Sequence, residues 1–168
     1  MVEGPSELVE LKRSPAPLSF RFEVVAVQST VQRSPASLAP RVALLDNRAE
    51  RRQLMRKVVE TGPVSVVVVG EADNASDAVG MVGEQQADVV IVEVQLPVEI
   101  GLQTLAELRA SCPHVGIAVC SFHLAADTQR QALECGADIY LAKPITPRLL
   151  SETVADLTAR SRGDGRGA

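Results

Sequence analysis

The chain has 168 residues, which is enough for one domain with tails, and 46% of them are hydrophobic, which is enough for a buried core. A net charge of −4 excludes the basic surface expected of a protein that binds nucleic acid or an anionic membrane. No run of about 18 apolar residues occurs, and the amino-terminal residues lack the pattern of a signal peptide. We therefore expect no membrane contact and a cytoplasmic location, where the three cysteines would stay free thiols.

The two ends of the chain differ from its middle. Residues 1–39 are rich in proline and repeat Arg-Ser-Pro-Ala at 13–16 and 33–36, which favours a flexible tail. Within them, residues 20–24 alternate apolar and charged side chains, so a short edge strand stays the alternative. Residues 161–168 are short, polar and rich in glycine, which predicts a disordered tail. The folded domain is expected over residues 40–160.

Five strand–helix units are predicted in chain order from residue 41. The strands are expected at 41–45, 64–69, 88–93, 115–120 and 138–142. Their nearly continuous apolar character is typical of parallel strands covered on both faces. Three of the intervening helices have clear apolar faces: Leu54, Met55, Val58 and Val59 in the first, Leu102, Leu105 and Leu108 in the third, and Leu149, Leu150, Val154 and Leu157 in the fifth.

Capping patterns mark the helix ends. Asn47 with Glu50 and Asn74 with Asp77 have the spacing of a capping box, Thr146 precedes a proline suited to the first helical position, and Gly136 follows the fourth helix. Repeated strand–helix units favour an α/β fold with right-handed crossovers. We expect a flavodoxin-like five-stranded parallel sheet, in the order 2-1-3-4-5, with helices on both faces.

Polar residues follow three of these strands. Asp46 and Asn47 end the first, Glu93 ends the third, and Lys143 follows the fifth. Because the carboxyl ends of parallel strands meet at one edge of the sheet, these side chains should converge there.

Over residues 40–160 the chain resembles the receiver domain of bacterial two-component response regulators, the CheY-like family. The matching positions are Asp46 and Asn47 for a pair of metal-binding acids, Glu93 for the phosphoacceptor aspartate, Ser121 for a hydroxyl residue, Tyr140 for a switch aromatic, and Lys143 for a lysine before a proline. The resemblance implies the same fold and a cis bond between Lys143 and Pro144. It also implies a role in signal transduction and phosphorelay.

Two of these positions depart from the family pattern. Glu93 is one methylene longer than aspartate, and a displacement of about 1 Å can reduce a rate roughly 10²-fold. Asn47 removes a negative charge from a magnesium site, which needs well-placed oxygen ligands. We therefore expect no phosphorylation, no cofactor beyond a weak Mg²⁺ at Asp46, and a static ion pair between Glu93 and Lys143.

Each residue also has a simpler interpretation. Asn47 is interpreted first as a helix N-cap. Glu93 is either a fixed-charge switch or a structural partner of the lysine. Ser121 either donates a hydrogen bond near Glu93 or caps a helix, and Tyr140 is either a switch or a half-buried aromatic. Cys120 is interpreted as a buried, inert thiol.

These features predict a stand-alone pseudo-receiver, a phosphorylation-independent protein-interaction module without enzymatic activity. The expected partner face spans the fourth helix, fifth strand and fifth helix and carries Tyr140 together with Gln129, Arg130, Arg148 and Glu152. A protein partner or a homodimer would use that face, because few residues remain after the fifth helix for an output domain. Two alternatives stay open: a residual Mg²⁺-dependent phosphoacceptor of a phosphorelay, and a small-molecule-binding flavodoxin-like module. The second lacks a glycine-rich phosphate loop after the first strand.

Overall fold

The computed structural model describes residues 39–94 and 98–164, without the side chains of residues 98, 99 and 164. The tail predicted over 1–39, with its alternative strand at 20–24, lies outside the described residues except for residue 39. In the described part of the chain, no helix is long and apolar enough to cross a membrane.

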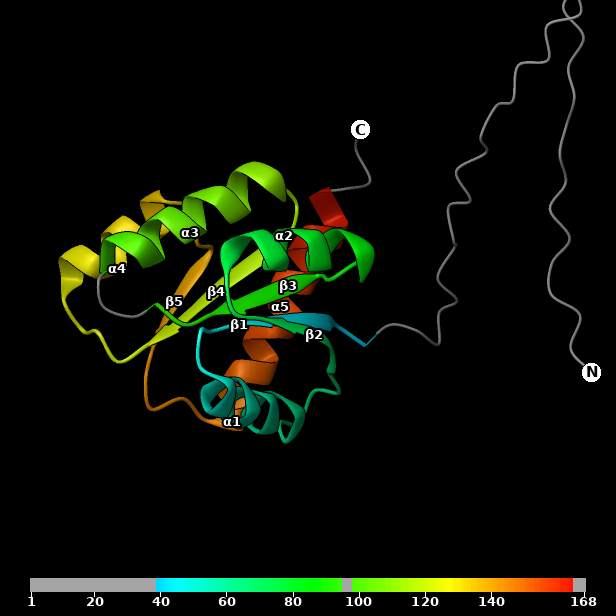
Figure 1. Cartoon of the computed structure of the whole chain (residues 1–168). Coiled ribbons are helices and arrows are strands. Elements are labelled where there is room, and N and C mark those ends of the chain that lie inside the picture. The colour runs from blue at the N-terminus through cyan, green and yellow to red at the C-terminus, as the bar shows by residue number, and fades with distance from the viewer. Residues whose placement is uncertain (1–38, 95–97, 165–168) are drawn as a thin grey trace, which may run out of the picture. The chain divides into compact units, whose positions relative to one another are not determined.

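Strands and helices alternate five times, as predicted (Figure 1). The strands are β1 (Arg41–Leu45), β2 (Val67–Ala72), β3 (Val89–Val92), β4 (Gly116–Ser121) and β5 (Ile139–Ala142). The helices are α1 (Ala49–Glu60), α2 (Ala75–Glu84), α3 (Val98–Ser111), α4 (Ala126–Glu134) and α5 (Pro147–Asp164).

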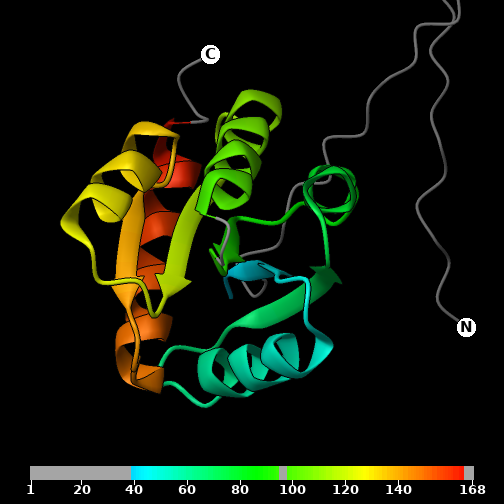
Figure 2. The same cartoon turned by 60° about the vertical axis from the view of Figure 1, so that its left-hand side comes forward.

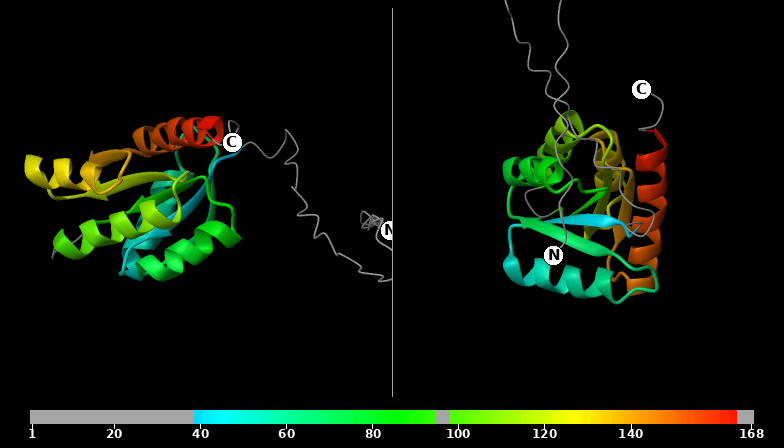
Figure 3. Two further views of the ribbon diagram at one scale, coloured as in Figure 1. Left: turned by 90° about the horizontal axis from the view of Figure 1, so that it is seen from above. Right: turned by 90° about the vertical axis from the view of Figure 1, so that its right-hand side faces the viewer.

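All neighbouring strands pair in parallel in the order β2-β1-β3-β4-β5, which confirms the predicted topology. β4 and β5 run side by side in Figure 2. The sheet lies between two layers of helices, with α1 and α5 on one face and α2, α3 and α4 on the other (Figure 3). The carboxyl ends of β1 and β3 therefore lie next to each other at the centre of one sheet edge.

Alternate strand residues face opposite layers, because side chains on a strand point to the two sides of the sheet in turn. In β1, Val42 and Leu44 pack with α1 and α5, whereas Ala43 and Leu45 pack with α2, α3 and α4. Helices therefore cover both faces of the sheet and exclude water from them, which explains the continuous apolar runs in the sequence.

The cap predictions are confirmed at three of four positions. The Asn74 side chain accepts a hydrogen bond from the Asp77 backbone N–H at 2.9 Å. Thr146 Oγ1 accepts one from the Leu149 N–H at 3.2 Å. Gly136 follows α4 with a φ of +111°, a left-handed conformation that glycine adopts without strain.

The fourth cap prediction was wrong. Asn47 is exposed, and the N-cap position of α1 belongs to Arg48, whose side chain makes no capping bond. The Asp46 carboxylate instead accepts a hydrogen bond from the Arg48 N–H at 2.8 Å. This bond turns the chain one residue later than the capping-box spacing suggested.

The structure also corrects three other predictions. β2 spans Val67–Ala72 and not 64–69, because an edge strand can carry polar residues in its second half. Leu54 and Leu149 are exposed by 63% and 47%, so neither belongs to the apolar face predicted for its helix. The helix α5 continues to Asp164, four residues into the predicted tail, because Arg162 forms an ion pair with Asp88 at 2.9 Å.

Candidate functional site

The predicted site residues Asp46, Asn47 and Glu93 come together at the carboxyl edge of the sheet. They line a hollow of about 250 Å³ between the loops after β1, β2 and β3, and Asp73 and Asn74 also line it. Asn47 and Asp73 are exposed at this hollow, whereas Asp46 is buried.

The first turns of α3 close the hollow on another side. Gly101 lies there, and a Cβ atom at this position would come within 2.6 Å of the Val94 side chain. A glycine is therefore needed for α3 to approach the end of β3 this closely.

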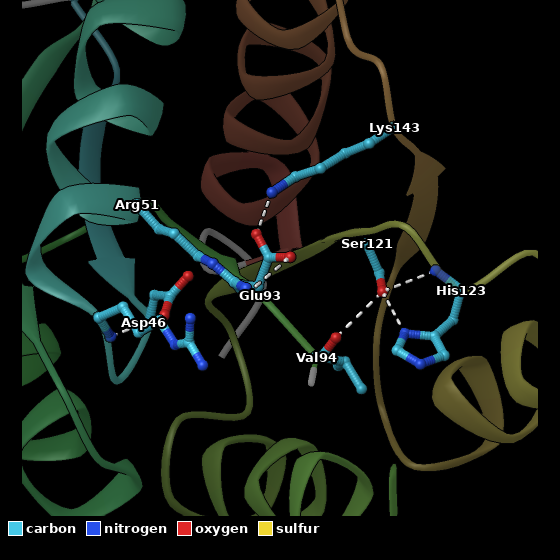
Figure 4. Close-up of polar contacts among 8 residues, drawn as sticks. Asp46, Arg51, Glu93, Val94, Ser121, His123 and Lys143 are labelled. Atoms are coloured by element: carbon cyan, nitrogen blue, oxygen red, sulfur yellow. Dashed lines mark hydrogen bonds and ion pairs between the residues drawn. The ribbon is translucent and has the colours of Figure 1, made fainter. Parts of the chain in front are cut away.

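Glu93 forms the predicted ion pair with Lys143 (Figure 4). The Glu93 side chain is only 5% exposed and that of Lys143 is 14% exposed, so the pair is largely withdrawn from water. Glu93 follows β3 and Lys143 follows β5, and the two meet across the carboxyl end of β4. The Lys143–Pro144 peptide bond is cis, as the resemblance implied.

A second cation approaches Glu93 that sequence reasoning missed. Arg51 Nη1 lies 3.8 Å from Glu93 Oε1, whereas Lys143 pairs with Oε2. Figure 4 shows the Glu93 carboxylate between the two cationic side chains. The signal in the sequence was the run Arg48, Arg51 and Arg52 at the start of a helix, where positive side chains are unfavourable.

In the described structure Ser121 donates its side-chain hydrogen bond not to Glu93 but to the residue next to it. Its buried hydroxyl donates a hydrogen bond to the Val94 carbonyl at 3.0 Å and accepts one from the His123 N–H at 3.2 Å. The His123 ring nitrogen Nδ1 also lies 3.2 Å from this hydroxyl. Ser121 therefore ties the ends of β3 and β4 together, and His123 is a further site residue that the sequence did not indicate.

Tyr140 is half-buried, and its hydroxyl donates a hydrogen bond to the His123 carbonyl at 2.8 Å. Phe122 lies between Ser121 and His123 in the sequence and is 68% exposed. Its ring centroid is 5.1 Å from Lys143 Nζ. The β4–α4 loop is thus connected both to Tyr140 and to the partner of Glu93.

The remaining residues of the predicted partner face lie on α4 and α5. Arg130 pairs with Asp127 at 2.9 Å, and Arg148 pairs with Glu152 at 2.9 Å, each within one helix. Both arginines are exposed, so these pairs leave them accessible.

Burial dominates the chemistry of the cysteine beside this site. It raises the pKa of Cys120 to about 12, although the nearby charge of Lys143 acts in the opposite direction. A thiol with this pKa is protonated at neutral pH, which supports the interpretation of Cys120 as inert.

The donor set at this site fits Mg²⁺ poorly. Among the described residues, no group of three acidic, histidine or cysteine side chains could hold a metal ion. Both oxygens of Glu93 face cations, and one oxygen of Asp46 accepts a backbone N–H. Mg²⁺ demands several oxygen ligands in near-octahedral geometry.

The sequence and fold place this chain in a known family. Residues 42–155 match the model of the response regulator receiver domain, so the chain belongs to this family of two-component signalling domains.

Particular relatives agree with this assignment. The chemotaxis protein CheY of Halobacterium salinarum is 25% identical over 120 residues, covering 71% of this chain and 98% of that protein. A protein-glutamate methylesterase/protein-glutamine glutaminase of Rhodospirillum centenum is 33% identical over 113 residues, covering 66% of this chain and 28% of the relative. The chain thus spans almost all of one relative but under a third of the other.

Solved structures show the same fold. The signal receiver domain of the response regulator NarL from Mycobacterium tuberculosis superposes with a TM-score of 0.63 and 26% identity, covering 72% of this chain and 97% of that domain.

Proposed function

We propose that this receiver domain works as a phosphorylation-independent protein-interaction module, a pseudo-receiver in bacterial signalling. One observation carries the proposal: the carboxylate that follows β3 belongs to Glu93, is 5% exposed and faces a cation at each oxygen. A phosphoacceptor carboxylate must instead present a free oxygen in line with the incoming phosphoryl group.

The fixed negative charge of Glu93 supports a domain held in one state. A phosphorylated aspartate would carry about −1.5 to −2 charges, whereas Glu93 carries one. Lys143 binds this single charge, and the Tyr140 hydroxyl donates a hydrogen bond to the His123 carbonyl. We infer that a protein partner, or a second copy of the chain, recognises this state at the face formed by α4, β5 and α5.

Labelling with a small phosphodonor tests the proposal. The wild-type protein should not incorporate label from acetyl phosphate in Mg²⁺. A matched variant, Glu93→Asp with Asn47→Asp, restores the shorter carboxylate and the missing charge and should incorporate more label. Stoichiometric, hydroxylamine-labile labelling of the wild-type protein would contradict the proposal.

A residual phosphoacceptor is the second candidate, because the hollow beside Asp46 and Glu93 is open to solvent. In that case Asp46 would take part in holding Mg²⁺, and the Asp46→Asn variant should lose whatever labelling the wild-type protein shows.

A further inference from the structure

The position of Arg51 suggests how this site keeps its charge balanced. Asp46 and Glu93 bring two negative charges to the carboxyl edge of the sheet. Lys143 and Arg51 bring two positive charges to Glu93, so the formal charges of these four side chains sum to zero. A divalent cation added to these four side chains would meet no excess negative charge apart from that of Asp73, an exposed residue that also lines the hollow.

The location of Arg51 on α1 is locally unfavourable. It lies in the first turn of the helix, where the helix dipole is positive and acidic side chains are preferred. A residue that breaks a local rule needs a compensating contact elsewhere. Its neighbour Arg52 has such contacts, because its guanidinium binds the Asp46 carbonyl at 2.6 Å and Glu71 at 3.1 Å. For Arg51 the corresponding contact is Glu93.

We propose that Arg51 is a built-in counter-charge of the Glu93 carboxylate, which takes the place of the divalent cation in balancing this site. Arg51 does not line the hollow; it reaches Glu93 from the α1 side, over the small space between α1 and the sheet. It therefore acts through charge, and it leaves the hollow itself open. This inference rests on the proposed function, since it explains why the site needs no metal.

The test is the affinity for Mg²⁺ alone, measured by titration calorimetry on the full chain. Arg51→Gln should bind Mg²⁺ at least about tenfold more tightly than the wild-type protein, because a positive charge within a few ångströms of the ligands is removed. Arg51→Met serves as a second neutral substitution, so that the result does not depend on one variant folding. Arg51→Lys keeps the charge and should bind as weakly as the wild-type protein.

Arg56→Gln is the matched control. It removes the same charge from the same helix, but Arg56 pairs with Glu71 and Glu60 and not with Glu93. If neutral variants at positions 51 and 56 change the affinity for Mg²⁺ equally, the inference is wrong and general surface charge explains the effect. Submillimolar binding by the wild-type protein would also overturn it.

The labelling experiment separates the two failures. Suppose that the wild-type protein takes up no label, and that Arg51→Gln and Arg56→Gln change the affinity for Mg²⁺ equally. The role of Arg51 would then be overturned, and the proposed function would stand. A labelled wild-type protein would overturn the proposed function, whatever the variants of Arg51 do.

Discussion

At the scale of single residues, the site is governed by the burial of one carboxylate. Removing a charge from water is costly unless it is paired, and unpairing a buried ion pair costs about 3–5 kcal/mol. Glu93 meets this requirement with Lys143 on one oxygen and Arg51 near the other. The pairing that stabilises the Glu93 charge at this largely buried position also occupies the atoms that phosphoryl transfer would need.

Cys120 gives the residue-scale prediction, which concerns alkaline pH. Burial raises its pKa from 9.0 to about 12, so the folded chain keeps a proton that the unfolded chain loses. The stabilisation is fully present below pH 9 and is lost as the pH rises toward 12. Urea unfolding at pH 8 and pH 10 should show a loss about 1.4 kcal/mol larger for the wild-type protein than for Cys120→Ala. An equal loss in the free energy of unfolding in the two proteins would contradict a raised pKa for Cys120.

At the scale of elements, arginine side chains fasten helices to the ends of strands. Arg109 on α3 donates hydrogen bonds to the carbonyls of Pro113, Val115 and Gly136 and to the Asp138 carboxylate, at 2.7–3.0 Å. The same carboxylate accepts the Ile117 N–H of β4 at 2.7 Å. One side chain therefore joins α3 to the amino ends of β4 and β5.

Loss of Arg109 should therefore be costly. Hydrogen bonds that involve a charged group are worth about 1.5–3 kcal/mol, and the four here share one side chain and are not additive. We expect Arg109→Ala to lower the free energy of unfolding by about 2–4 kcal/mol in urea titrations.

Arg130→Ala is the control for this change. Arg130 is exposed and pairs only with Asp127 one turn away in the described structure, a contact worth about 0.3–0.5 kcal/mol. If both variants lost a similar free energy of unfolding, the hydrogen bonds of Arg109 would contribute no more to stability than one exposed ion pair.

The same elements show what the sequence can and cannot predict. Helix number, the approximate strand positions and three of four caps followed from apolar runs and short polar patterns, because these depend on neighbours along the chain. The strand order followed instead from the fold class that repeated strand–helix units favour. Leu54 and Leu149 fit a helical apolar face yet are exposed, because the tertiary fold decides which side of each helix faces the sheet. Asn47 lost its capping role to a bond between Asp46 and Arg48 that no spacing rule describes.

The candidate site divides in the same way. The convergence of Asp46, Glu93 and Lys143 follows from parallel strands that end at one edge, and the structure confirms the ion pair. Arg51 and His123 were missed because both reach the site from loops and helix turns whose direction the sequence does not fix.

At the scale of the whole molecule, a chain of contacts joins the Glu93 site to the predicted partner face. Ser121 links Val94 to His123, and His123 accepts the hydrogen bond of Tyr140 on β5. Lys143 connects the same loop to Glu93 through the ring of Phe122. If the site holds the domain in one state, disturbing the Glu93–Lys143 ion pair should change the environment of Tyr140.

The chain supplies its own reporter, because it contains one tyrosine and no tryptophan, so tyrosine fluorescence reports on Tyr140 alone. Lys143→Met leaves Glu93 with Arg51 as its cation. A fully unpaired buried charge costs about 3–5 kcal/mol, so we expect a smaller loss in the free energy of unfolding. We also expect the fluorescence of Tyr140 to change. Adding Glu93→Gln should restore part of both, with a coupling energy of about 0.5–3 kcal/mol.

Arg148→Met is the matched control for this cycle. It removes a cation from the predicted partner face that carries Tyr140, but Arg148 pairs with Glu152 and not with Glu93. It should change neither the stability nor the fluorescence of Tyr140 appreciably. If Lys143→Met destabilises the fold but leaves the Tyr140 signal as in the wild-type protein, the ion pair is purely structural. Recognition of a partner would then depend on exposed residues such as Arg130 and Arg148, independently of Glu93.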